Sequence, residues 1–245
     1  MVAYIKYNQP TMSTMIQRYE QFDPSTVVLS NMKKNKNGGK TVYINAQGNK
    51  KLYLQLPFMR SPFGLSAFTD EATNKTSYSL DLSFDRDNEE AVSLMEKLTQ
   101  LDQTIIETVA KNSKDWLGKA YNIDVIREAL YKPLVRPGKD DYPSTLKLKV
   151  MTKPTGEFLA EAYDIQQKSM TVDGIEKGQR CMCIVDFNQI WFIDNKFGVS
   201  VRLSQVLCEK SQKLPSFAFQ GVEGIAGSGS DDDASVDEDE CEIDE

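Results

Sequence analysis

The first third of the chain alternates apolar and polar residues, a pattern typical of half-buried β-strands. The segments that show it lie at residues 26–34, 40–47, 51–57 and 77–84. In residues 51–57 the leucines share one face, whereas Lys51 and Tyr53 share the opposite face. An Asn- and Gly-rich stretch, residues 33–40, separates the first two segments and suits a tight turn. The pattern therefore predicts antiparallel strands with a basic hairpin tip.

The hydrophobic period changes to that of an amphipathic helix over residues 88–116. The apolar residues that recur there at intervals of three or four are Ala91, Leu94, Leu98, Leu101 and Ile105. A shorter helix is expected over residues 123–130. Residues 144–151, 157–165 and 180–208 then return to a strand pattern, and the stretch 181–201 is apolar on both faces, as in a central strand.

Strands and helices do not alternate along the chain, which favours an antiparallel barrel over a doubly wound sheet. We expect a mainly β fold, an oligonucleotide-binding (OB) barrel with helical material inserted between its third and fourth strands. The pattern alone also permits a different β-sandwich. We assign residues 1–220 to this domain, with the helical insertion at about 87–131, and residues 221–245 to a flexible linker and a disordered acidic tail.

The charge of the chain is concentrated at its C-terminal end. Of 36 acidic residues, ten lie in residues 231–245, which contain no basic residue, so residues 1–230 keep a small excess of their 29 basic residues. The acidic positions are Asp231, Asp232, Asp233, Asp237, Glu238, Asp239, Glu240, Glu242, Asp244 and Glu245. The body is mildly basic, and one separable segment accounts for the net charge of -7.

Several function classes are excluded by residues that the chain lacks. The sequence has no histidine, which removes Ser-His-Asp and Cys-His nucleophiles and histidine-containing zinc sites. It also has no Walker A or GxGxxG motif. Cys181, Cys183 and Cys208 are better explained as small buried apolar residues than as metal ligands. We expect no enzyme, no cofactor and no metal, and a carboxylate-metal nuclease is a distant alternative.

The chain shows no sign of secretion or membrane insertion. Its N-terminal residues lack the pattern of a signal peptide, and no apolar run approaches the ~18 residues of a membrane span. Four cysteines do not form the disulfide framework of a small secreted protein. We therefore expect a non-secreted, intracellular protein in a reducing compartment.

Basic residues and aromatic rings are interleaved on the polar faces of the predicted strands. Such faces suit single-stranded nucleic acid, because rings stack on unpaired bases and cations follow the phosphates. The candidate residues on these strands are Tyr43, Lys51, Tyr53, Lys147, Lys149 and Arg202, with Trp191 nearby on a strand that is apolar on both faces. Further candidates are Lys33, Lys34, Lys36 and Lys40 in the basic hairpin tip, and Arg60 and Phe63 in the aromatic loop expected at residues 57–68. Each group also has a purely structural explanation. The strand residues would form a solvated face with cross-strand aromatic pairs, the lysines would form a soluble turn, and the phenylalanines of the loop would close one end of the barrel.

The acidic tail resembles a phosphate backbone in charge. Ten carboxylates on a Gly- and Ser-rich tether could occupy the basic surface of the body until nucleic acid displaces them. The alternatives are a solubility tail and a phosphorylation site, because Ser228, Ser230 and Ser235 precede acidic residues.

The chain resembles the phage T7-type single-stranded DNA-binding proteins of nucleocytoplasmic large DNA viruses in four stretches, SPFGLSAF, SYSLDLSF, YPSTLKLKV and IWFIDNKFGVSVRLSQV. The resemblance covers about residues 25–207 and is followed by the expected acidic tail. One departure is the C-terminus, which ends in Ile243-Asp244-Glu245, whereas the T7-type tail ends in an aromatic residue. This difference bears on the contacts of the tail more than on its charge.

The resemblance implies an OB barrel that coats single-stranded DNA during viral replication and recombination, in the host cytoplasm or nucleus. It also implies that the tail contacts the viral DNA polymerase or primase-helicase. The sequence leaves open the oligomeric state, a homo-oligomer included, and the choice between DNA and RNA. The alternative from another class is an acidic-tailed chaperone or virion protein that binds basic partners and no DNA.

Overall fold

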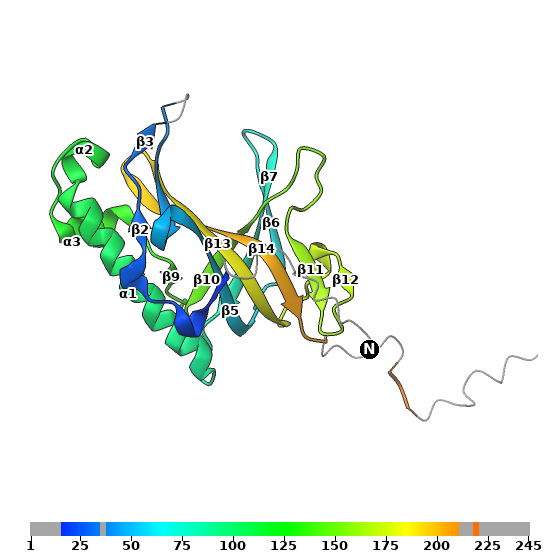
Figure 1. Cartoon of the computed structure of the whole chain (residues 1–245). Helices are drawn as coiled ribbons and strands as arrows, with labels where there is room; N and C mark the ends of the chain where they lie inside the picture. The colour runs from blue at the N-terminus through cyan, green and yellow to red at the C-terminus, as the bar shows by residue number, and fades with distance from the viewer. Residues whose placement is uncertain (1–15, 35–37, 211–217, 221–245) are drawn as a thin grey trace, which may run out of the picture. The chain divides into compact units, whose positions relative to one another are not determined.

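The structure is a computed structural model that describes residues 16–34, 38–210 and 218–220 (Figure 1). The chain divides into two units, Met1–Ser211 and Gln212–Glu245, and the described helices and strands all lie in the first. The predicted acidic tail and Lys36 lie outside the described residues.

Five strands close into a ring at the centre of the first unit. They are β5 (Lys50–Arg60), β7 (Lys75–Ser83), β10 (Thr145–Val150), β13 (Arg180–Ile193) and β14 (Lys196–Cys208). Around the ring the order is β5, β7, β10, β14, β13 and back to β5. Only the β10–β14 pair of this ring is parallel. This five-stranded Greek-key ring is the arrangement of an OB barrel, so the predicted mainly β fold is confirmed.

Further strands extend the sheet beyond this ring. They are β1 (Ile16–Arg18), β2 (Val28–Leu29), β3 (Lys33–Lys34), β4 (Lys40–Ala46), β6 (Leu65–Asp70), β8 (Tyr131–Lys132), β9 (Val135–Arg136), β11 (Glu161–Asp164) and β12 (Ser169–Met170). Strands β3 and β4 form the predicted basic hairpin. Strands β6 and β7 form a second hairpin, and β13 and β14 form a third that turns at Asp194, whose φ is positive.

The helical insertion lies between β7 and β10. It consists of α1 (Glu89–Lys111), α2 (Ser113–Leu117), α3 (Ile123–Val125) and a single π-helical turn, Ile126–Leu130. It follows the second strand of the ring, so its expected position between the third and fourth strands is wrong. The reason lies in the tertiary structure. Strand β4 alternates like a ring strand but is not part of the ring; it pairs with β2, β3, the start of β5 and the far half of β13.

Helix α1 packs its apolar stripe against the barrel, along which Figure 1 shows it running. The predicted stripe residues Leu94, Leu98 and Leu101 are completely buried. Asn88 caps the start of the helix: its side-chain oxygen accepts a hydrogen bond of 3.1 Å from the Ala91 amide, and the first turn contains the acidic residues Glu89 and Glu90. Among the described residues, no helix is long and apolar enough to cross a lipid bilayer.

A buried carboxylate ties α1 to the chain that returns to the barrel. Asp102 of α1 accepts a hydrogen bond from the Tyr131 hydroxyl and others from the Leu134 amide at 3.1 and 3.2 Å. Burial raises the pKa of Asp102 to about 6, although these hydrogen bonds oppose the shift. The contacts fix the segment that carries β8 and β9, and thereby the position of Arg136 beside β10.

Candidate nucleic-acid interface

A groove with a volume of about 530 Å³ crosses the outer face of the barrel between the β6–β7 and β13–β14 hairpins. Its lining comes from strands far apart in the sequence. The lining residues are Ser66, Ala67, Phe68, Ser77, Tyr78, Ser79, Arg136, Lys147, Lys149, Gln189, Trp191, Ile193, Val199, Ser200, Val201 and Arg202. We call this surface the basic groove.

The cations of the basic groove are placed by the alternation of β10. Leu146, Leu148 and Val150 are buried in the core, so Lys147 and Lys149 project outward and are exposed. Lys149 lies opposite Arg202 of β14, its neighbour in the ring. Pairing between β10 and β14 therefore brings two positive charges that are distant in the sequence side by side.

Arg136, Lys147, Lys149 and Arg202 have no salt-bridge partner within 4 Å among the described residues. Two carboxylates adjoin them. Asp81 lies opposite Lys147 on β7, and burial raises its pKa, while the charges of Lys147 and Arg136 oppose the shift. Asp186 lies opposite Arg202 on β13. The groove keeps a surplus of positive charge.

Arg202 and Asp186 each bury a polar atom that finds no hydrogen-bond partner in the described structure. These atoms are the Arg202 Nε and one carboxylate oxygen of Asp186. An unbonded buried donor is costly, and a ligand with acceptor oxygens would satisfy it. Arg202 lines the basic groove, so its guanidinium can donate hydrogen bonds to an anionic group there.

Aromatic and apolar side chains line the same groove. Phe68 is 68% exposed and Ile193 is 63% exposed, on β6 and at the end of β13 respectively. Trp191 is half-buried and lies over Gly198, where an added Cβ would be 2.9 Å from its Cζ2 atom and 3.0 Å from the Lys132 carbonyl oxygen. Glycine at this position lets the Trp191 ring approach β14 closely.

Four of the predicted residues, Lys147, Lys149, Trp191 and Arg202, line the basic groove. Others lie on strands beside it. Tyr43 lies opposite Gln189, and the Lys33 Nζ is 5.1 Å from the centre of its ring. Tyr53 lies opposite Asp186, and the Lys51 Nζ is 5.9 Å from its ring centre.

The remaining predicted residues that the structure describes do not line the basic groove. Lys34 is exposed on β3, and the Lys40 ammonium donates a 2.9 Å hydrogen bond to the Trp116 carbonyl at the end of α2. The Arg60 guanidinium donates two hydrogen bonds, of 2.9 and 2.8 Å, to Asp85. Phe63 is 60% exposed in the loop after β5.

The predicted set did not include Phe68, Tyr78, Arg136 or Ile193, which also line the groove. Phe68 belongs, like Phe63, to the aromatic stretch of residues 57–68, so the sequence pattern favoured both phenylalanines equally. Arg136 lies beside a proline and has no periodic pattern around it. Its position follows from the pairing of β9 with β10, which brings Val135 opposite Leu146.

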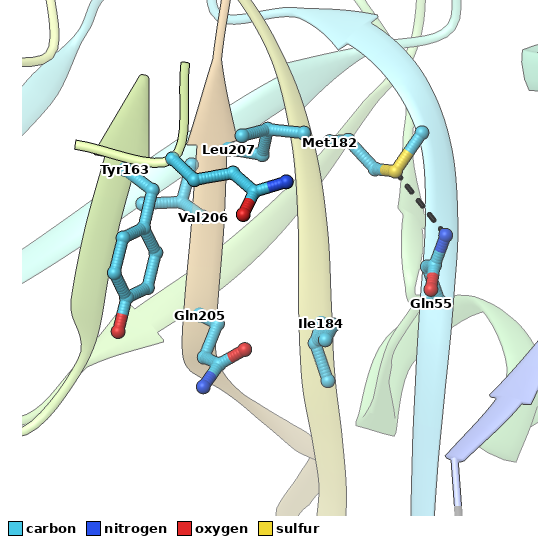
Figure 2. Close-up of a pocket in the computed structure, with 8 residues that line it drawn as sticks. Gln55, Tyr163, Met182, Ile184, Gln205, Val206 and Leu207 are labelled. Carbon is cyan, nitrogen blue, oxygen red and sulfur yellow. Dashed lines mark hydrogen bonds between the residues drawn. The ribbon is translucent and has the colours of Figure 1, made fainter. Parts of the chain in front are cut away.

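A second, uncharged pocket lies further along the outer faces of β5, β13 and β14, with a volume of about 480 Å³ (Figure 2). Its lining residues are Gln55, Tyr163, Gln167, Met182, Ile184, Gln205, Val206 and Leu207. Figure 2 shows the Gln55 amide beside the Met182 sulfur, with a nitrogen-to-sulfur distance of 3.2 Å. None of the predicted binding residues lines this pocket.

Solved structures similar to this chain include two single-stranded DNA-binding proteins of bacteriophages. The protein from bacteriophage Enc34, in complex with single-stranded DNA, is 12% identical, with a TM-score of 0.40 over 76% of this chain and 97% of that chain. The protein encoded by bacteriophage T7 is 13% identical, with a TM-score of 0.42 over 76% of this chain and 100% of that chain.

No curated protein matches the chain. The sequence model of a family described as being of unknown function, DUF5871, matches residues 80–220. The match runs from the middle of β7 through the helical insertion and past the end of β14, and it covers more than half of the chain. The chain therefore belongs to the DUF5871 family.

Proposed function

We propose that the basic groove binds single-stranded DNA without strong sequence preference, and that the protein coats such DNA during viral replication and recombination. The observation that carries the proposal is the lining of the groove. Four cations for which the described residues provide no salt-bridge partner, Arg136, Lys147, Lys149 and Arg202, lie in one groove with exposed or half-buried rings. Cations that follow phosphates beside rings that stack on bases are what single-stranded binding requires.

The location of the groove on the barrel supports the same proposal. OB barrels bind oligonucleotides across their second and third strands, between the loop that joins strands one and two and the loop that joins strands four and five. In this ring the second and third strands are β7 and β10. The β6–β7 hairpin lies at the connection between strands one and two, and the turn of the β13–β14 hairpin joins strands four and five. Phe68 and Ile193 project from these two hairpins into the groove.

The polar and aromatic groups take separate roles in the proposed complex. The Arg202 guanidinium and the neighbouring Lys149 ammonium donate hydrogen bonds to phosphate oxygens, whereas the Trp191 and Phe68 rings stack on bases. Tyr43 and Tyr53, on β4 and β5 beside β13, would extend the stacking surface away from the groove. Every base has a π-face, so this arrangement discriminates little between sequences.

We expect the full chain to bind an oligo-dT at least tenfold more tightly than a duplex of equal length, because a duplex hides the faces on which rings stack. A fluorescence anisotropy titration at several salt concentrations measures this ratio, and an oligo-rU titration separates DNA from RNA. The affinity for oligo-dT should fall with log salt at a slope of roughly -0.7 for each phosphate neutralised. Equal affinity for single strand and duplex at about 0.15 M salt would contradict the proposal.

The acidic tail has two proposed roles: it competes with DNA for the basic groove, and it recruits the viral polymerase or primase-helicase. The support is charge complementarity between ten carboxylates in residues 231–245 and the four cations of the groove. A tethered segment acts at an effective concentration of up to roughly millimolar. Competition of this kind weakens as salt screens both partners.

Removal of residues 231–245 should tighten binding to oligo-dT at least about threefold at low salt, because the groove then has no tethered competitor. The matched control replaces the ten acidic residues with Asn and Gln, which keeps the length of the tail and removes its charge. Both variants should behave alike in an anisotropy titration. Unchanged affinity in both would contradict the competitive role. Loss of binding to basic protein partners alone would favour the chaperone or virion alternative.

A further inference from the structure

Three cysteines lie in the core where β13 begins and β14 ends. Cys181 and Cys183 belong to β13 and Cys208 is the last residue of β14, and all three are buried. The sulfur atoms of Cys181 and Cys208 are 3.6 Å apart. Cys183 lies opposite Val206 instead of a cysteine. Among the described residues, no group of three or more metal-ligating side chains could hold a metal ion.

The backbone around Cys181 and Cys208 has the geometry that a disulfide needs. The two residues lie directly opposite each other in the antiparallel β13–β14 pair. The neighbouring pair is hydrogen-bonded, because the Glu209 amide donates to the Arg180 carbonyl oxygen at 2.9 Å. Hydrogen-bonded and non-hydrogen-bonded pairs of residues alternate along antiparallel strands, so Cys181 and Cys208 form a non-hydrogen-bonded pair. Cα atoms there are about 4.5 Å apart, within the range of about 4.4–6.8 Å that disulfides span.

We propose that Cys181 and Cys208 form a thiol–disulfide modification site, open in a reducing environment and closed by a peroxide or a small-molecule disulfide. Cys183, only two residues from Cys181 on the same face of β13, takes no part in the bond. The proposal concerns the core at one end of the barrel and does not depend on DNA binding by the basic groove.

We take Cys208, the last residue of β14, as the residue that reacts first. The hydrogen bond from the Cys181 thiol lowers the pKa of Cys208, although burial opposes the shift. Its thiolate attacks one oxygen of hydrogen peroxide, which releases hydroxide and leaves a sulfenic acid. The Cys181 sulfur then attacks the sulfenic sulfur, loses its proton and releases water. Two thiols and one peroxide thus give one disulfide and two waters, and two electrons pass from sulfur to oxygen.

Access to the buried sulfurs requires only a local opening. Both cysteines lie within one residue of a strand end, and the adjacent Arg180–Glu209 salt bridge, with a distance of 3.4 Å, is partly exposed. Strand ends open far more readily than the whole domain unfolds. The reaction should therefore be slow but measurable on the native protein, and Arg180→Ala should accelerate it.

The bond would join β13 to β14 at the open end of their hairpin. Both strands belong to the ring and both contribute to the basic groove. A disulfide stabilises a fold mainly by restricting the unfolded chain. We expect the oxidised protein to melt at a temperature roughly 5–10 °C above that of the reduced protein.

The test uses the reduced full-length protein, treated with hydrogen peroxide and, in parallel, with oxidised glutathione. Free thiols are then alkylated and the protein is digested with trypsin. Mass spectrometry should find the peptide of residues 181–196 joined to that of residues 203–210, and reduction should separate them. Failure of this linked peptide to form in the wild-type protein with either oxidant would overturn the proposal, and no variant is needed for that result.

Matched variants identify the bonded pair. Cys183→Ala should retain the linked peptide and the melting shift, whereas Cys181→Ala and Cys208→Ala should lose both. Circular dichroism of each reduced variant checks that it folds. A link that survives Cys181→Ala, or that Cys183→Ala abolishes while the variant remains folded, would assign the bond to another pair and disprove the site. Oligo-dT affinity of the oxidised protein is a separate readout, because the linked peptide forms or fails irrespective of DNA binding.

Discussion

Replacement of both Lys149 and Arg202 by glutamine should lower the affinity for oligo-dT about 100-fold at low salt, roughly 0.05 M. The two residues are neighbours across the parallel β10–β14 pair, and no salt bridge within 4 Å engages either one among the described residues. Each should donate to a phosphate, and a hydrogen bond to a charged group contributes about 1.5 kcal/mol or more. The double substitution removes two such contacts.

The salt dependence distinguishes this loss from a general change in structure. Two fewer neutralised phosphates should reduce the slope of log affinity against log salt by roughly 1.4. The matched control is Lys111→Gln with Arg127→Gln, which also removes one lysine and one arginine charge, but from the helical insertion and outside the basic groove. The control should keep both the affinity and the slope nearly unchanged. Equal losses in the two double variants would mean that total charge, and not the groove, governs binding.

Trp191→Ala should lower the affinity for oligo-dT between about 5-fold and 150-fold, because the stacking of one ring on a base contributes about 1–3 kcal/mol. The ring lies on the outer face of β13 in the basic groove and is held over Gly198. Phe192, the next residue, points to the opposite face and is buried. The slope of affinity against salt should stay the same, since no charge is removed.

Two further variants separate stacking from stability. Trp191→Phe keeps a ring and should recover part of the affinity. Trp116→Ala removes a tryptophan that packs edge-on against Phe192, with ring centres 6.0 Å apart, and that does not line the groove. It should lower the melting temperature without the loss of affinity. If Trp191→Ala melts like the wild type and binds oligo-dT equally well, the ring does not stack on DNA.

The sequence by itself determined the helical insertion and the regularly alternating strands, and which side of each faces the core. The strands β6, β8, β9 and β12 showed no such pattern. The leucines of residues 51–57 and of α1 are buried as their spacing predicts, because periods of two and of three to four residues place apolar side chains on one face. The same alternation predicted that Lys147 and Lys149 project outward from β10. These features depend only on neighbouring residues, and a sequence records neighbours directly.

Only the tertiary structure decided which strands close the ring and which side chains meet. Alternation assigns a face to β4 but no partner strand, so the membership of the ring, and with it the position of the helical insertion, could not be read from the pattern. The engagement of Lys40 with Trp116 and of Arg60 with Asp85 likewise needs long-range contacts. The basic groove combines Phe68, Arg136, Lys149, Trp191 and Arg202, which lie on five different strands. Proximity between such residues arises from strand pairing, which no local period encodes.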